Sequence, residues 1–118
     1  MGRQNFLALA LIASSVFMSF DGMADRFRYQ KSFALKVGET KSVYAVRHRD
    51  CESMPSFESL EDRLPDTDLG SFSDGGETTG KSRACDGVVP TRAIAFTATK
   101  KGEETLDFFG YRISLTVE

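Results

Sequence analysis

Tryptophan is absent from this 118-residue chain, histidine occurs once and cysteine occurs only twice. A zinc site prefers four Cys or His ligands at close spacing, so two cysteines and His48 do not favour one. A single histidine beside a cysteine also argues against a Ser-His-Asp or Cys-His catalytic arrangement. With no tryptophan and ten phenylalanines, we expect Phe, Val, Leu and Ile to fill the core.

An excess of charge of one sign is missing as well. The chain has 15 basic and 17 acidic residues, which gives a net charge of −2. This balance provides no electrostatic footprint for nucleic acid. It also provides no polybasic segment for an anionic membrane surface.

Long apolar runs are confined to the N-terminus. An early arginine, an apolar run over 6–20 broken only by serines, and the small residues of Gly22-Met23-Ala24 are typical of a signal peptide. The alternative is a retained membrane anchor, which needs about 20 apolar residues, more than this run has. We predict a signal peptide over residues 1–24. Its removal leaves one domain, residues 25–118, with no stable membrane anchor.

Cys51 and Cys85 both lie in the predicted mature domain. In an exported protein, an even number of cysteines favours a disulfide. This bridge closes a loop of about 35 residues, which is worth about 4 kcal/mol in the chain-entropy model. A redox-active pair is disfavoured because the chain has no C-x-x-C spacing. We therefore predict a structural disulfide.

Alternation of apolar and polar residues recurs along the mature domain. It is clearest over 111–117 and predicts a strand there. Similar patterns predict further strands over the ranges 32–37, 91–99 and 104–109. The range 40–47 has apolar residues on both faces, which predicts a central strand or a strand covered on both sides. No segment carries a long helical apolar stripe, and only 58–64 has the pattern of one or two helical turns. The sequence predicts an all-β protein, an antiparallel immunoglobulin-like β-sandwich of six to eight strands.

The stretch 49–87 differs from the rest because it is rich in Gly, Ser, Asp and Thr and holds two of the three prolines. We predict one long polar loop here, with its two ends joined by the disulfide. A loop of this length is unusual in a compact domain, and the bridge supplies the reason that it persists. Because recognition residues concentrate on loops, we expect function within 66–82.

Residues 93–117 read AIAFTATKKGEETLDFFGYRISLTV. This stretch resembles the last three strands of small bacterial exported immunoglobulin-like domains, and chagasin-type cysteine-protease inhibitors share this ending. The inhibitors' N-P-T-T-G-Y-like loop has no counterpart here. A tight turn at 109–111 stands where their R-P-W loop should lie. The resemblance therefore implies the sandwich fold and says little for protease inhibition.

Four carboxylates partly match a calcium loop. Asp66, Asp68, Asp74 and Glu77 fall at positions one, three, nine and twelve of a twelve-residue loop, and clustered oxygens of this kind suit a hard cation. Position six, where glycine is needed, is Ser71. We predict no metal site of the helix–loop–helix kind, and a non-helical calcium loop stays open as an alternative.

Residues 75–82, GGETTGKS, match the phosphate-loop pattern letter for letter. A phosphate loop needs a buried strand before it and a helix after it, and the flanking residues predict neither. We interpret the segment as a flexible loop and predict no cofactor. Arg83 and Arg92 flank the turn over 85–90, and they are the candidate partner-binding residues because they suit an acidic partner.

No pattern selects catalytic residues, so we predict that the protein is not an enzyme. We expect an exported binding or accessory module, in the periplasm or the medium, whose rigid β scaffold presents a polar loop. Its expected partner is a protein or another envelope component, and not nucleic acid. Two alternatives stay open: an inhibitor of a secreted protease or other enzyme, and a calcium-binding or envelope-structural domain.

Overall fold

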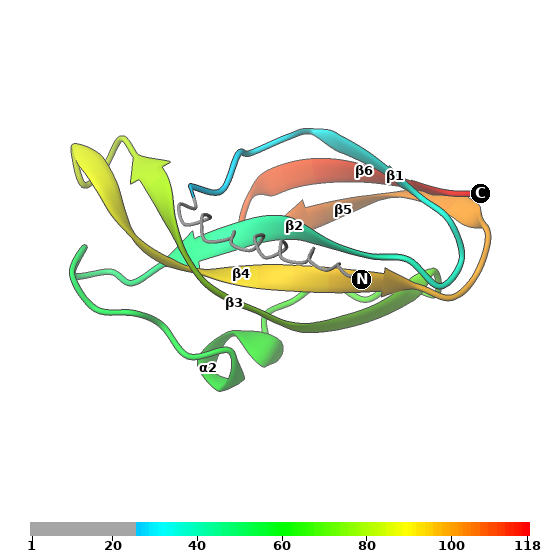
Figure 1. Cartoon of the computed structure of the whole chain (residues 1–118), viewed down its shortest axis with the longest axis horizontal. Helices are drawn as coiled ribbons and strands as arrows, with labels where there is room; N and C mark the ends of the chain where they lie inside the picture. Colours follow the sequence, from blue (N-terminus) through cyan, green and yellow to red (C-terminus); the bar gives the residue numbers. More distant parts are fainter. Residues whose placement is uncertain (1–25) are drawn as a thin grey trace, which may run out of the picture.

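The computed structural model describes residues 26–118, so the predicted signal peptide lies outside the described residues. The described chain forms two three-stranded β-sheets, in the orders β1-β6-β5 and β2-β4-β3. Figure 1 shows them as two layers with the single helical turn below the second one. The elements are β1 (Ser32–Leu35), β2 (Thr40–Arg47), α2 (Glu58–Glu61), β3 (Gly70–Ser82), β4 (Gly87–Ala98), β5 (Gly102–Phe108) and β6 (Tyr111–Val117).

The core lies between the two sheets and draws on both of them. Phe96 of β4 and Phe108 of β5 are fully buried, as are Ile113 and Leu115 of β6. These are inward positions of alternating strands, so the apolar–polar pattern of the sequence identified them correctly. The predicted all-β class and the predicted core of Phe, Leu, Ile and Val are confirmed.

One strand pair departs from the predicted antiparallel arrangement. β1 pairs with β6 in parallel, with Phe33 opposite Leu115, while every other strand pair is antiparallel in the described part of the chain. The chain leaves β1 through Gly38, at a φ of 93°, and crosses to the other sheet. β1 and β2 are therefore not a hairpin, and β1 is free to align with the last strand.

The long polar loop predicted within 49–87 is partly wrong, because Gly70–Ser82 is the strand β3. β3 pairs with β4 along its whole length, from Gly70 opposite Ala98 to Ser82 opposite Gly87. Backbone hydrogen bonds to β4 stabilise β3, so β3 needs few apolar side chains of its own. Glycine also permits the close approach of the two chains, since a Cβ on Gly75 would lie 2.9 Å from Ala93.

The β3–β4 hairpin extends past the end of β2. The first four residues of β4, 87–90, pair only with β3, because the β2 pairing begins at Thr91. Figure 1 shows this hairpin projecting at one end of the molecule. The segment 48–69, which joins β2 to β3, starts at the same end and contains α2, the predicted helical turn.

The predicted disulfide is confirmed and ties these two features together. Cys51 lies just after β2, and Cys85 lies in the turn of the β3–β4 hairpin, with 5.8 Å between their Cα atoms. The bridge therefore fastens the projecting hairpin to the start of segment 48–69. A domain of this size has a small core, and such a bridge supplements it.

Candidate functional site

A groove of about 840 Å³ lies at the end of the molecule where β2 stops and the hairpin projects. Its walls come from the end of β2, the hairpin, the segment 48–69, the N-terminal residues around Tyr29 and the β5–β6 turn. The volume falls in the range of sites that hold small molecules, about 300–1,000 Å³. The groove is open along one side, so an elongated ligand can enter it.

The groove is cationic although the whole chain carries a net charge of −2. Five basic side chains line it: Arg47, Arg49, Arg63, Lys81 and Arg83. Within residues 26–118, none of the five forms an ion pair, and no Asp or Glu lines the groove. The positive charge is therefore not neutralised by the protein itself.

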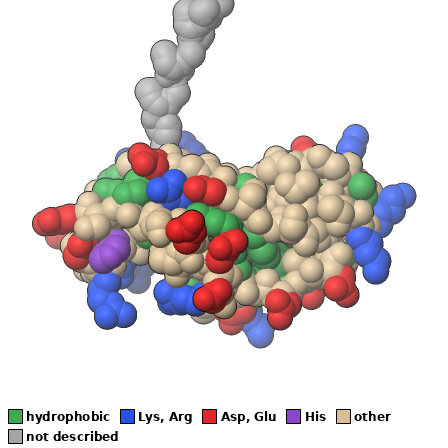
Figure 2. Space-filling view, turned by 90° about the horizontal axis from the view of Figure 1, so that it is seen from below, with side chains coloured by type: hydrophobic (Ala, Val, Ile, Leu, Met, Phe, Trp, Pro, Cys, Tyr) green, Lys and Arg blue, Asp and Glu red, His purple; other side chains and the backbone are tan. Residues whose placement is uncertain are grey.

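Figure 2 shows the only histidine of the chain at one end of the molecule, beside a group of Lys and Arg side chains. Asp and Glu side chains also lie beside the histidine and continue along the same face, and a second group of Lys and Arg side chains lies at the opposite end. The basic side chains of the groove therefore differ from the others by their lack of ion pairs within residues 26–118 and not by their place on this face.

Asp50 follows directly after the groove residue Arg49, and its carboxylate is hydrogen-bonded within its own turn. Asp50 accepts hydrogen bonds from the hydroxyl and the backbone N–H of Ser53 and from the backbone N–H of Glu52. These bonds hold the pKa of the Asp50 carboxyl well below its usual range. Its Oδ1 also lies 3.2 Å from Nδ1 of His48. Asp50 therefore shapes the turn before the disulfide, and it is not among the side chains that line the groove.

The disulfide brings the basic residues together. Arg47 and Arg49 precede Cys51 by four and two positions, and Lys81 and Arg83 precede Cys85 at the same spacings. Joining the two cysteines therefore places two short basic segments side by side. The prediction of the disulfide contained this information, and the basic residues before each cysteine were the signal that the sequence analysis missed.

Aromatic rings form one wall of the groove. The Tyr44 ring lies 5.5 Å from Tyr29, 5.6 Å from Tyr111 and 6.1 Å from Phe109, measured between ring centroids. The guanidinium of Arg63 lies over the Phe109 ring, 4.7 Å from its centroid, in a cation–π contact. The groove therefore combines flat apolar faces with cations.

The Tyr29 and Tyr44 hydroxyls remain hydrogen-bond donors across the physiological pH range. The Tyr29 hydroxyl donates to the Ala45 carbonyl at 2.9 Å. Burial, with a smaller contribution from Tyr44, raises the pKa of Tyr29 to about 12. Burial, followed by Tyr111 and then Asp107, also raises the pKa of Tyr44. The Tyr44 and Tyr111 hydroxyls make no hydrogen bond within the described chain, so they are free to bind a ligand.

Phe109 holds its ring in the groove at a cost in backbone energy. It occupies the first central position of the β5–β6 turn with a φ of 56°, followed by Gly110 at 92°. Such a turn favours Asn-Gly, because a bulky residue in the left-handed region costs about 1–2 kcal/mol. Strain of this kind is concentrated at functional sites. The strained phenylalanine is a further indication that the groove is functional.

Thr91 lies in the groove with an unsatisfied polar group. The residue is 1% exposed, and its hydroxyl has no hydrogen-bond partner within the described chain. Gly80 faces it, and a Cβ there would lie 3.1 Å from Cγ2 of Thr91 and 3.0 Å from the Tyr29 hydroxyl. A buried hydroxyl without a partner is uncommon and costs stability.

We expect Thr91→Val to stabilise the free protein by about 1 kcal/mol, because valine keeps the shape and removes the unpaired hydroxyl. Equilibrium urea unfolding measures the change. Thr97→Val is the matched control on the same strand, since the Thr97 hydroxyl is paired with that of Thr40 at 2.7 Å, and it is expected to give no gain. If Thr91→Val loses as much stability as Thr97→Val, the Thr91 hydroxyl is not an unpaired group in the folded protein.

The two predicted partner-binding arginines have different surroundings. Arg83 lies in the groove. Arg92 does not: its side chain is 15% exposed and lies 3.3 Å from the Asp74 carboxylate. Its Nε also donates to the Pro55 carbonyl at 3.0 Å. Arg92 therefore holds the segment 48–69 against the sheet, and only Arg83 is available to a partner.

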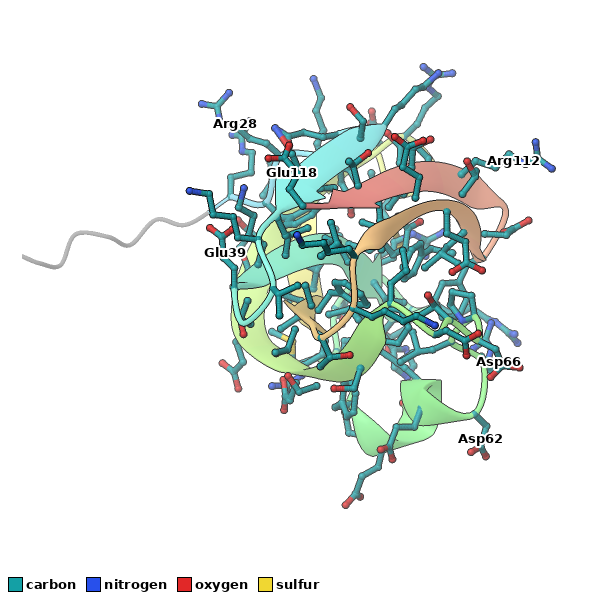
Figure 3. All side chains as sticks on the ribbon, turned by 90° about the vertical axis from the view of Figure 1, so that its right-hand side faces the viewer. Arg28, Glu39, Asp62, Asp66, Arg112 and Glu118 are labelled. Atoms are coloured by element: carbon teal, nitrogen blue, oxygen red, sulfur yellow. A yellow bond between two sulfur atoms is a disulfide. The ribbon has the colours of Figure 1, made fainter. Side chains whose placement is uncertain are left out.

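The four carboxylates of the alternative calcium loop are not gathered. Asp74 and Glu77 both lie beside Arg92, and Asp66 points outward from segment 48–69, as Figure 3 shows. No group of three or more His, Cys, Asp or Glu side chains within residues 26–118 has the spacing of a metal site. Asp68 is exposed on the same segment as Asp66. The structure thus provides no cluster of oxygen ligands in this region.

The phosphate-loop pattern over 75–82 lies in the extended strand β3, and a turn follows it instead of a helix. Its backbone N–H groups therefore do not converge as those of a phosphate loop do. Lys81, the lysine of the pattern, instead lines the groove. The motif is a coincidence of letters, although one of its residues belongs to the candidate site.

Comparisons with protein-family models, with curated proteins and with solved structures give no match to this chain. Among the described helices, none has the length and apolar character needed to cross a membrane. The functional assignment therefore depends on the geometry and charge of the groove.

Proposed function

We propose that the protein is an exported, non-enzymatic binding module that holds negatively charged groups of a partner in this groove. The observation that carries the proposal is the set of five unpaired cations, Arg47, Arg49, Arg63, Lys81 and Arg83, in a groove that no carboxylate of the described chain lines. Like charges are held together here against their mutual repulsion, and a bound anion removes that repulsion.

The chemistry of the groove supports binding in preference to catalysis. Acid–base catalysis usually pairs two titratable groups with different roles. Among the described residues that line the groove, His48 is the only imidazole, and its Nδ1 already accepts the backbone N–H of Asp50 at 3.2 Å. Arginine and tyrosine donors suit the recognition of carboxylate, sulfate or phosphate groups.

The disulfide supports export, because such bonds form and persist outside the reducing cytosol. Two facing sheets with a buried core between them also support the immunoglobulin-like assignment of the scaffold. No observation on the structure favours the protease-inhibitor alternative. The calcium alternative lacks gathered oxygen ligands in the described chain.

Titration calorimetry with polygalacturonate, poly-L-glutamate and neutral dextran tests the proposal. We expect saturable binding of at least one polyanion and none of dextran. Raising the salt from about 0.05 M to about 0.5 M is expected to weaken binding by about tenfold, because exposed charges are screened. Absence of polyanion binding at the lower salt concentration would refute the proposal.

A further inference from the structure

The cations are distributed around the groove and do not converge on one point. Arg47 and Arg49 lie at the end of β2, Arg63 follows α2, and Lys81 and Arg83 lie at the hairpin tip. A single small anion is usually held by donors that converge on it. Cations on three separate segments, around a groove of about 840 Å³, instead match a ligand that carries several negative groups along its length.

Aromatic rings and tyrosine hydroxyl groups also line the groove. The Tyr111 and Tyr44 rings are stacked at an interplanar angle of 29°, and the Phe109 ring lies alongside at 15° to Tyr44. Stacking covers the faces that these rings turn toward one another, so a sugar would contact the parts of the rings that line the groove. Tyrosine adds a polar group at the ring edge.

An acidic peptide fits the groove less well. An extended peptide gains most of its affinity by adding a strand to a sheet edge, and both edge strands of this sheet, β2 and β3, reach the groove. On the β3 edge, the Phe27 N–H already donates to the Thr79 carbonyl at 2.7 Å. The Ala45 carbonyl on β2 already accepts the Tyr29 hydroxyl at 2.9 Å. This contact uses a backbone group at the place where strand addition would need one.

From this combination we infer that the ligand is an acidic oligosaccharide, whose sugar units carry carboxylate or sulfate groups. The inference rests on the proposed function, since it names the class of anion that the groove holds. The cations pair with the acidic groups, and the rings of Phe109, Tyr44 and Tyr111 contact the sugar rings. The hydroxyls of Tyr44 and Tyr111 bind the sugar hydroxyls.

The test compares three short probes at about 0.15 M salt, close to physiological ionic strength. They are trigalacturonate, triglutamate acetylated at its N-terminus and amidated at its C-terminus so that it carries the same charge, and neutral maltotriose. We expect trigalacturonate to bind about tenfold more tightly than triglutamate, and maltotriose not to bind. Intrinsic tyrosine fluorescence or calorimetry reports the affinities.

Phe109→Asn tests the sugar contact separately from the charge. Asparagine tolerates the left-handed backbone at this position, so the turn and the fold are expected to remain intact. We expect the variant to weaken trigalacturonate binding by about fivefold and poly-L-glutamate binding by less than about twofold, because Arg63 loses its ring contact but keeps its charge. Circular dichroism and thermal melting establish that the variant is folded.

The outcomes separate the two proposals. If triglutamate binds as tightly as trigalacturonate, or if Phe109→Asn leaves trigalacturonate binding unchanged, the sugar inference is overturned and the anion-binding function stands. If poly-L-glutamate binds and neither uronate probe binds, the sugar inference is also overturned, the anion-binding function stands, and the result points to an acidic protein as the ligand. If no polyanion binds the wild-type protein, both proposals fail.

Discussion

Replacing both cysteines with serine will lower the free energy of unfolding by about 4 kcal/mol and will weaken anion binding. The bridge spans 34 positions, and a closed loop of that length removes about this much conformational free energy from the unfolded chain. Native proteins of this size are stable by about 5–15 kcal/mol, so the loss is a large fraction of the total. The disulfide is therefore expected to be the largest single covalent contribution to the fold.

The loss of binding follows from the position of the bridge. Cys85 lies at the tip of the hairpin, where residues 87–90 pair only with β3, and Cys51 follows directly after β2. Without the bridge, the tip with Lys81 and Arg83 is no longer fastened to Arg47 and Arg49. The cationic groups then separate, and the groove loses its charge density.

Urea unfolding and polygalacturonate titration measure the two effects. Cys51→Ala with Cys85→Ala is the second variant, because it removes the bridge without adding hydroxyl groups. Wild-type protein treated with a reductant provides the same comparison without any substitution. If the three forms bind as tightly as the oxidised protein, the bridge does not assemble the site.

Reversing two charges in the groove, Arg49→Glu with Arg83→Glu, is expected to weaken polyanion binding by at least about tenfold, or about 1.4 kcal/mol. Both side chains are exposed, and neither forms a hydrogen bond or an ion pair within the described chain. The substitutions are therefore expected to change unfolding by less than about 0.5 kcal/mol. The effect should be confined to binding.

Lys100→Glu with Lys101→Glu is the matched control, since it makes the same change in net charge. These lysines are exposed in the β4–β5 turn, at the opposite end of β4 from the hairpin tip. A strand of twelve residues spans about 40 Å, so the two sites are well separated at ordinary ionic strength. Equal losses in the two double variants would mean that binding follows net charge and not the groove.

The sequence predicted those parts of the fold that local patterns encode. Alternation identified β6 with its observed bounds, and it identified the core positions Phe108, Ile113 and Leu115. The apolar residues on both faces of 40–47 identified β2 with its observed bounds, but β2 is an edge strand and not a central one. The pairing of Cys51 with Cys85 followed from the predicted export and from there being only two cysteines. These predictions needed no knowledge of which strands are neighbours.

β3 was missed because its stability comes from its partner strand and not from its own side chains. Most of its residues are Gly, Ser or Thr, and Phe72 is its only large apolar residue. Such a segment is typical of a loop when it is considered alone. Its pairing with the apolar strand β4 is a long-range property, and no local pattern encodes it.

The groove was predicted only in part. Arg83 was identified, and the basic residues before each cysteine would have identified Arg47, Arg49 and Lys81 once the bridge was assumed. No local pattern in the sequence indicates that Arg63 contacts Phe109, because this contact depends on how segment 48–69 and the β5–β6 turn fold toward each other. Arg92 was indistinguishable from Arg83 in the sequence, since its contacts with Asp74 and Pro55 are tertiary.

The most direct measurement is an amide NMR titration of the isotope-labelled mature protein with oligogalacturonate. If the groove is the anion site, the largest shift changes will occur at 47–49, at 80–83 and at Tyr111, while those at 100–101 will stay near the noise. Largest changes at 100–101, or changes spread evenly over all exposed basic residues, would contradict the groove as the site of binding.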